Sequence, residues 1–441
     1  MNTNRIITSL DIGTTAIKAF IAKKNEEGKI KIIGFGTTES IGVEAGVVTN
    51  PGQAAESIKI ALEQAECEAD VKVEEVYVGV AGFHLQDRKV ACSTIRDKHD
   101  VFITKEEVLE LRKKQLSINR PEGMDIIDIM EQKYRVDDQE CEPKDVIGME
   151  GSSLVGEYNI VLGSTSCLRR IENSVRAAGY KLKGLILQSI ASAEAVLSAE
   201  DKSVGVCLVD IGGGTTDIAI FNKGVVRYIK SFPSAGNHIT LDIERAYNLT
   251  PKNAEDIKIK YGTCLPEALK QQDLVVTIPG YKGSKAKEIP LKHLAGVVKS
   301  RVEEILDFIL VELHNTNFLH NLQVIIMTGG GSQTRNIKQL SEYHIPDLAT
   351  NIAPINEEYF DNLPDNLKQP IYATGLGLVI AAFKEEDEEM EQQDELLKEM
   401  EQQDSSDNKE NNSDNNDTES ETTTFLQRIK DWLTFKPFSD N

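Results

Sequence analysis

Two glycine-rich turns, each opened by an aspartate, are the parts of this sequence best suited to chemistry. Residues 11–15 read Asp-Ile-Gly-Thr-Thr, and residues 210–217 read Asp-Ile-Gly-Gly-Gly-Thr-Thr-Asp. Glycine tolerates backbone conformations that other residues avoid, so such turns can direct several N–H groups at one phosphate. The leading carboxylates suit the water shell of a Mg²⁺ ion that bridges phosphates. The candidate phosphate-binding residues are Gly13, Thr14, Thr15, Gly212, Gly213, Gly214 and Thr215, and the candidate Mg²⁺ residues, acting through water, are Asp11 and Asp210.

A third glycine turn, residues 328–332 (TGGGS), ends the apolar run 322–328, which reads as a buried strand. Its flat backbone is suited to stacking beneath an adenosine. One glycine-rich hairpin is usually only a hairpin, so none of the three turns is specific alone. Their order, with spacings of about 200 and about 115 residues, is far more specific and indicates a nucleotide site.

Short strands are the elements that must position these turns. Apolar, β-branched runs at 5–10 and 15–22 flank the first turn, and runs at 204–211 and 218–221 flank the second. The same strand, turn and strand unit therefore occurs twice. This duplication predicts an α/β fold of two related domains around a cleft.

Residues 84–163 predict a small α/β insertion between the two units. The segment 104–117 begins with a capping-box pattern and has a partly apolar face, which indicates a helix. The segments 126–136 and 158–166 are strand-like. In the second half, 299–313 predicts a strongly amphipathic helix.

The composition changes after Phe383. Residues 384–424 carry 17 Asp or Glu against three Lys, with almost nothing apolar after Met400. Such a segment cannot offset its ordering entropy, so it predicts a disordered acidic linker.

The last residues predict an amphipathic helix over 425–438. Thr424 and Gln427 form a capping-box pattern, and Pro437 marks the stop. The segment is too short to span a bilayer and is expected to lie in the headgroup plane, although docking back on the body is the alternative. At 100° per residue, five apolar side chains fall within an arc of about 120°; they are Phe425, Leu426, Ile429, Trp432 and Leu433.

Bulk properties exclude several function classes. The net charge is −22 and no stripe of Lys and Arg appears, which argues against nucleic-acid binding. The six cysteines are scattered singly, so we expect reduced thiols and no zinc site. No signal peptide and no apolar run of about 18 residues is present, which predicts a cytoplasmic protein.

The ordered turns resemble the phosphate 1, phosphate 2 and adenosine motifs of the actin, Hsp70 and sugar-kinase superfamily. That resemblance covers roughly residues 5–383. Within the superfamily the chain is similar to the FtsA family, and the insertion resembles the relocated 1C subdomain of that family. The blocks that carry this likeness are VEEVYVGVAGFHLQ (73–86), LILQSIASAEAVL (185–197), GVCLVDIGGGTTDIAIF (205–221), FPSAGNHITLDI (232–243) and AEDIKIKYG (254–262).

The resemblance implies an actin-like (ribonuclease H-like) fold that binds ATP and Mg²⁺ and is at most a slow ATPase. It implies water positioning by Gln188 and nucleotide contacts by Glu255, Lys258, Gly330, Gly331 and Ser332. The alternative for Gln188 is a purely structural role. The alternative for Glu255 and Lys258 is that they belong to a solvated helix face. The implied divisions are subdomain IA (1–83 and 164–199), insertion 1C (84–163), IIA (200–239 and 300–383), IIB (240–299), the acidic linker (384–424) and the membrane-targeting helix (425–438).

The resemblance also implies partners and a location. These are the C-terminal tail of FtsZ, further copies of the chain in filaments, membrane lipids and later division proteins, at the cytoplasmic side of the inner membrane of the septum. The alternatives are a sugar or acetate kinase, an Hsp70-like chaperone and another actin-like scaffold. Only 58 residues follow Phe383, too few for a chaperone's peptide-binding domain. The acidic linker and amphipathic tail count against a kinase, and the tail and insertion count against other scaffolds.

Overall fold

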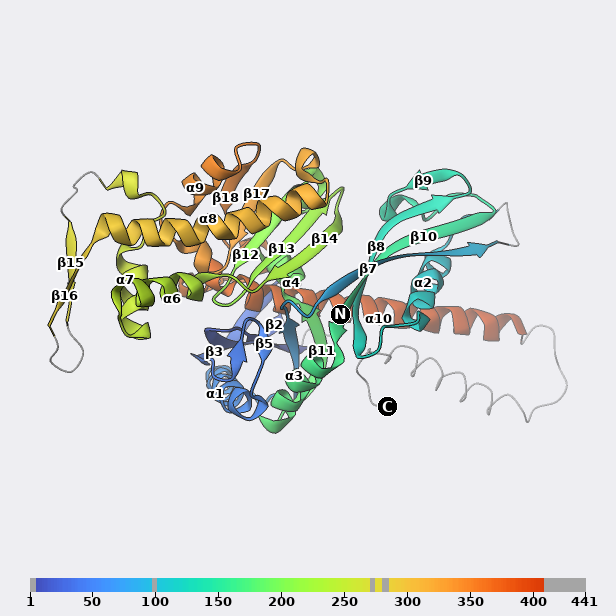
Figure 1. Ribbon diagram of the computed structural model, residues 1–441. Helices are drawn as coiled ribbons and strands as arrows, with labels where there is room; N and C mark the ends of the chain where they lie inside the picture. Colours follow the sequence, from blue (N-terminus) through green and yellow to red (C-terminus); the bar gives the residue numbers. More distant parts are fainter. Residues whose placement is uncertain (1–4, 97–100, 270–273, 280–284, 408–441) are drawn as a thin grey trace.

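The computed structural model describes residues 5–96, 101–269, 274–279 and 285–407. Its frame is two five-stranded sheets with the same strand order (Figure 1). In each sheet, three consecutive antiparallel strands are followed by two parallel strands. The shared order confirms the duplicated α/β architecture.

The first sheet has the order β11-β6-β1-β2-β3. Helices α1 and α3 pack against one another beside it, and α1 covers β2 and β3. A two-stranded hairpin, β4 with β5, leads into α1. The bounds are β1 (Ile6–Ile12), β2 (Ala16–Lys24), β3 (Ile30–Glu39), β4 (Val43–Glu44), β5 (Val47–Val48), α1 (Pro51–Ala69), β6 (Glu75–Val80), α3 (Thr165–Ala177), β11 (Lys181–Leu187), α4 (Gln188–Val196) and α5 (Ala199–Val204).

The second sheet has the order β14-β13-β12-β17-β18. Strand β12 is buried on both faces, since Cys207 and Val209 belong to the core under α8 while Val206 and Leu208 belong to the core shared with the first half. The bounds are β12 (Val206–Ile211), β13 (Thr216–Asn222), β14 (Val225–Phe232), α6 (Gly236–Tyr247), α7 (Pro251–Tyr261), β15 (Val275–Ile278), β16 (Lys287–Pro290), α8 (Leu291–Asn315), β17 (Val324–Thr328), α9 (Ile337–His344) and β18 (Ala349–Ile352).

The predicted insertion is a separate four-stranded sheet with its own apolar core, at the right of Figure 1. Its strand order is β7-β10-β8-β9, and α2 packs on one face. The capping box is confirmed, because Thr104 and Glu107 bond each other's backbone N–H groups. The bounds are β7 (Gln86–Ile95), α2 (Lys105–Lys114), β8 (Met124–Val136), β9 (Gln139–Cys141) and β10 (Ser153–Ser164).

Two helices, α4 and α10 (Ala373–Asp407), cross between the halves. Their backbones approach closely at Gly377, where an added Cβ would overlap the carbonyl of Ala191. Only glycine allows this approach. The crossing brings polar residues of both helices to the end of β12.

The predicted start of the linker at Lys384 is wrong, because α10 continues through Asp407. Residues such as Glu, Gln, Lys and Leu favour helix, whereas the Asn-, Ser- and Thr-rich sequence that discourages it comes later. Ion pairs also hold the middle of α10, where Glu386 lies 2.7 Å from Lys183 and 3.5 Å from Arg5. The rest of the linker and the helix predicted over 425–438 lie outside the described residues.

Candidate functional site

The two predicted phosphate turns face each other across the contact between the halves. A Cβ added to Gly213 would overlap the hydroxyl of Thr15, and one added to Gly214 would overlap the hydroxyl of Thr14. Asn237, at the start of α6, joins the turns: its N–H donates to the carbonyl of Gly213 at 2.8 Å, and its Oδ1 accepts from Thr15 at 3.2 Å. The tertiary structure therefore brings together residues far apart in sequence.

Asp11 is the last but one residue of β1 and is held by two side chains. In the β1–β2 register it lies opposite Lys18, whose Nζ is 3.0 Å from its Oδ2. Gln188 donates from Nε2 to the other oxygen at 3.3 Å and to the carbonyl of Gly79 at 3.5 Å. Because Asp11 is 4% exposed, these partners compensate a buried charge. Gln188 is thus at the first turn, as the water-positioning hypothesis requires.

Asp210 occupies the matching position at the end of β12. Its Oδ2 accepts hydrogen bonds from Ser192 of α4 at 2.5 Å and from Thr374 of α10 at 3.0 Å. Burial raises the pKa of Asp210, these two hydrogen bonds oppose the rise, and the nearby charge of Asp11 adds to it. The two aspartates therefore lie close enough to interact through their charges.

The two carboxylates fit a Mg²⁺ ion that is held through water. Among the residues that the structure describes, no three His, Cys, Asp or Glu side chains form a metal-binding group. The described residues therefore do not form a metal site made of protein ligands alone. Mg²⁺ typically keeps several waters and takes one or two carboxylates plus phosphate oxygens, and Asp11 and Asp210 supply that kind of set.

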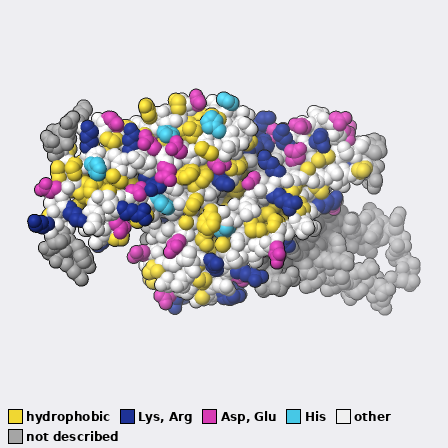
Figure 2. All heavy atoms as spheres, in the orientation of Figure 1, with side chains coloured by type: hydrophobic (Ala, Val, Ile, Leu, Met, Phe, Trp, Pro, Cys, Tyr) yellow, Lys and Arg dark blue, Asp and Glu magenta, His cyan; other side chains and the backbone are white. Residues whose placement is uncertain are grey.

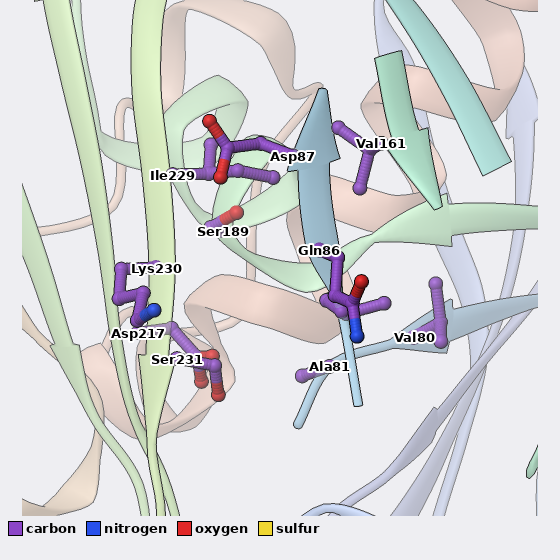
Figure 3. A pocket seen from close by; sticks show the side chains of 11 residues that line it. Val80, Ala81, Gln86, Asp87, Val161, Ser189, Asp217, Ile229, Lys230 and Ser231 are labelled. Atoms are coloured by element: carbon purple, nitrogen blue, oxygen red, sulfur yellow. The ribbon is translucent and has the colours of Figure 1, made fainter. Parts of the chain in front are cut away.

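Asp217 closes the second turn and lies opposite Asp210 in the β12–β13 register. It accepts a hydrogen bond from Thr215 at 3.0 Å, and burial raises its pKa to about 7. Asp217 also lines a cavity of about 270 Å³ where the two halves and the insertion meet. In Figure 3, Asp217 and Ser231 lie across this cavity from Ala81 and Gln86.

The third turn folds against the second half's first strand. Gly329 adopts a φ of 82°, and an added Cβ there would overlap the Asp210 carboxylate. Ser332 is buried and donates to the carbonyl of Gly329 at 2.7 Å, so its hydroxyl shapes the turn. Gly331 packs on Ile211, whereas a Cβ on Gly330 would meet a side chain only at 3.6 Å, which leaves that residue the most open of the three.

Glu255 and Lys258, on α7, point toward the second turn. Lys258 donates to the carbonyl of Gly236 at 3.0 Å and pairs with Glu255 at 2.7 Å. The N–H of Gly236 in turn donates to the carbonyl of Gly212 at 3.1 Å. The Lys258 side chain is 14% exposed, so it does not belong to a solvated helix face.

Sequence reasoning missed several residues that complete the site. The largest omission is Lys18, although a hairpin places residues equally distant from its turn opposite each other, which pairs 11 with 18. The other missed residues have no local sequence signal. They reach the site through the crossing of α4 with α10 and through the start of α6. They are Ser192, Thr374 and Asn237.

The face of the molecule drawn in Figure 2 shows acidic and basic side chains interspersed over its described residues. On this face they form no broad stripe of one sign. Among the described parts of the chain, no helix has the length and apolar character needed to cross a bilayer.

Comparisons with known proteins agree with this architecture. A family model described as "Cell division protein FtsA" matches residues 207–377, and one described as "SHS2 domain inserted in FTSA" matches residues 87–162. The chain is 33% identical to the cell division protein FtsA of Neisseria meningitidis serogroup B, covering 87% of this chain and 91% of the relative. It is 31% identical to that of Pseudomonas aeruginosa, with coverages of 88% and 92%.

Solved structures show the same fold at low identity. The PilM-PilN type IV pilus biogenesis complex matches with a TM-score of 0.60 at 17% identity, covering 85% of this chain and 98% of that chain. MreB5 of Spiroplasma citri bound to ADP matches with a TM-score of 0.51 at 16% identity, with coverages of 88% and 99%. The fold is therefore actin-like with an inserted subdomain, and the extent of the sequence identity shows that this chain belongs to the FtsA family of cell division proteins.

Proposed function

We propose that the chain binds ATP with Mg²⁺ between its two halves and uses the nucleotide to set the closure of this cleft. The observation that carries the proposal is the packing of Gly213 and Gly214 against Thr15 and Thr14. Two loops rich in backbone N–H groups, each preceded by a buried carboxylate, suit a polyphosphate with a divalent cation. MreB5 of Spiroplasma citri, which shares this fold, was solved bound to ADP, and this supports the proposal.

Each residue of the site has a role in nucleotide binding that follows from its position. The turns hold phosphate oxygens, while Asp11 and Asp210 orient the water shell of Mg²⁺, which neutralises phosphate charge when bound. Lys18 places a positive charge beside Asp11. Gln188 orients a water near the first turn, and Glu255 and Lys258 border the base and ribose. Hydrolysis is slow, because a scaffold needs the nucleotide mainly for its conformation.

The proposed role is to tie filaments of FtsZ to the cytoplasmic side of the inner membrane at the septum. The chain polymerises, docks the FtsZ tail on its 240–320 region, and recruits later division proteins. Exposed apolar side chains support the docking region, since Ile259 on α7 is 65% exposed and Val311 on α8 is 53% exposed. The helix predicted over 425–438 supplies the peripheral membrane contact.

Co-sedimentation of the purified chain with liposomes and FtsZ, with and without ATP, tests this role. We expect FtsZ to pellet with liposomes only when the chain is present, and ATP to increase the amount. FtsZ lacking its C-terminal tail is the control and should stay in solution. Equal affinity for tailed and tailless FtsZ in a fluorescence-anisotropy assay would refute the docking mode, and rapid phosphate transfer to a small-molecule acceptor would refute the scaffold.

A further inference from the structure

A groove of about 310 Å³ lies between the first half, the insertion and α10. Figure 1 shows α10 running past the insertion, and residues of α2, β8, β11, α4 and α10 line the groove. Its apolar floor comes mainly from β11, the edge strand of the first sheet, and its acidic rim comes from α10. The floor includes Leu185, Ile186 and Ile190, and the rim includes Glu385, Glu388 and Glu389.

The floor is incompletely covered by the described chain. Leu185, Ile186 and Ile190 are each only half-buried, although all three are large aliphatic residues. Apolar surface with a polar rim is typical of a site that receives another segment. On the opposite wall Arg112 lies 3.9 Å from Asp128, so its charge is directed at that carboxylate. The exposed carboxylate of Glu388 on α10 favours a cationic, amphipathic occupant.

We propose that this groove binds residues 425–438 of the same chain when no membrane is present. Around the predicted helix, the apolar stripe ends at Trp432 on one side and Leu426 on the other. At 100° per residue, Arg428 lies about 40° beyond Trp432, and Lys430 lies about 40° beyond Leu426. An apolar stripe bordered by cations on both edges matches an apolar floor with an acidic rim.

The intervening chain is long enough for this contact. From Glu388 to Asp407 α10 advances 19 residues, or about 29 Å at about 1.5 Å per residue. Seventeen residues separate Asp407 from Phe425. A flexible coil of that length has a root-mean-square span of about 21–25 Å and a full extension of about 56–61 Å. The coil length is close to the return distance, which makes the effective concentration of the tail at the groove about millimolar.

The consequence is competition between groove and lipid for one apolar stripe. This inference rests on the proposed membrane role of 425–438. If the groove holds about nine-tenths of the tails, the apparent affinity of one molecule for vesicles is about tenfold lower than that of a freed tail. Lipid surfaces that engage many tails at once then favour polymers over single molecules.

Trp432 is the single tryptophan of the chain, so its fluorescence reports on this segment in the intact protein. Without lipid, we expect a blue-shifted emission and weaker acrylamide quenching than in a free peptide of residues 424–441.

Carbodiimide, which joins Lys to Glu directly, should link Lys430 to Glu388 within one molecule, independently of dilution. A link that fades on dilution would instead assign the groove to the tail of a second copy and overturn the intramolecular proposal.

Glu388→Lys is the test variant, because Glu388 is exposed on α10 and its replacement should not disturb the core. It should restore peptide-like quenching and raise binding to vesicles of phosphatidylglycerol and phosphatidylethanolamine about tenfold. Glu63→Lys, the same charge change on α1, should leave both values as in the parent protein. Unchanged quenching in Glu388→Lys, or peptide-like quenching in the parent, overturns the proposal. Failure of both proteins to bind vesicles would instead overturn the membrane role.

Discussion

Gly214 lies so close to Thr14 that any side chain on the glycine would overlap the threonine hydroxyl. The two residues belong to the two phosphate turns, one from each half of the molecule. The width of the cleft at this point therefore depends on the absence of one Cβ atom. This relationship gives the most direct test of the nucleotide site.

Gly214→Ala should push the turns apart and weaken binding of Mg-ATP. Forcing an extra carbon into a packed contact costs about 1–3 kcal/mol, which corresponds to roughly 5- to 150-fold in affinity. Isothermal titration measures this loss. Gly296→Ala is the matched control, because an added Cβ there, in the second turn of α8, meets nothing within 4 Å. Alanine should stabilise that helix by about 0.5–1 kcal/mol. Equal affinity of Gly214→Ala and the parent would contradict the site.

Asp210→Ala should weaken Mg-ATP binding sharply by removing a carboxylate from the metal's water shell. Because Ser192 and Thr374 would also lose their acceptor, Asp210→Asn is tested beside it, since the amide oxygen keeps an acceptor without the charge. Titration calorimetry with and without Mg²⁺ should show the loss of Mg-ATP affinity in both Asp210→Ala and Asp210→Asn. Asp256→Ala, at an exposed position of α7, should bind normally. Wild-type affinity in folded Asp210→Asn would rule out Asp210 as a metal residue.

Gln188→Ala should slow ATP hydrolysis while leaving ATP binding nearly unchanged. The Gln188 amide lies 3.3 Å from Asp11 and is placed to orient a water, a role whose loss costs roughly 100-fold in rate. Single-turnover phosphate release is the measurement, and Glu200→Ala on the exposed side of α5 is the control. An unaltered rate would leave Gln188 with a structural role.

Asp217 should make stability depend on pH. Burial raises its pKa to about 7 in the folded chain, against about 3.9 when unfolded. The protonated carboxyl therefore stabilises the fold below about pH 4, and this contribution is lost as the pH rises to about 7. Across that window the free energy of unfolding of the parent should fall relative to Asp217→Asn, by up to about 4 kcal/mol.

Urea denaturation at several pH values measures the difference between these two proteins. The slope should disappear above about pH 7, where both states of the parent are ionised. A difference that stays constant from pH 4 to 7 would show that Asp217 titrates normally.

Trp432→Glu should abolish membrane binding and keep ATP binding. It places a charge at the edge of the predicted apolar stripe that carries the only indole, and burying that charge in lipid is costly. Thr434→Glu adds the same charge on the predicted polar face and should float with liposomes nearly as the parent does. Undiminished flotation of Trp432→Glu would show that this segment is not the anchor.

Local patterns in the sequence were enough to predict the repeated frame. Strand, glycine turn and strand follow from apolar β-branched runs around residues that accept unusual backbone angles. The capping box at Thr104 and Glu107 predicted α2 for a similar reason, since both partners lie within one helical turn. Such signals are readable because the groups that interact are neighbours in the chain.

The residue at which the folded part of the chain ends could not be predicted in this way. Acidic composition after Phe383 indicated a linker, yet α10 continues to Asp407. Lys183 and Arg5, distant in sequence, pair with Glu386 on this helix. Composition describes the charge of a segment but not the cations that folding places beside it.

By itself, then, the sequence determined the turns, their order and the family, because these depend on residue type and short spacing. Only the tertiary structure decided which side chains surround each carboxylate. Lys18 and Gln188 meet Asp11, and Ser192 and Thr374 meet Asp210, through a hairpin register and the crossing of α4 with α10. Those contacts depend on how separate elements pack, and packing is a property of the whole chain rather than of any short stretch of it.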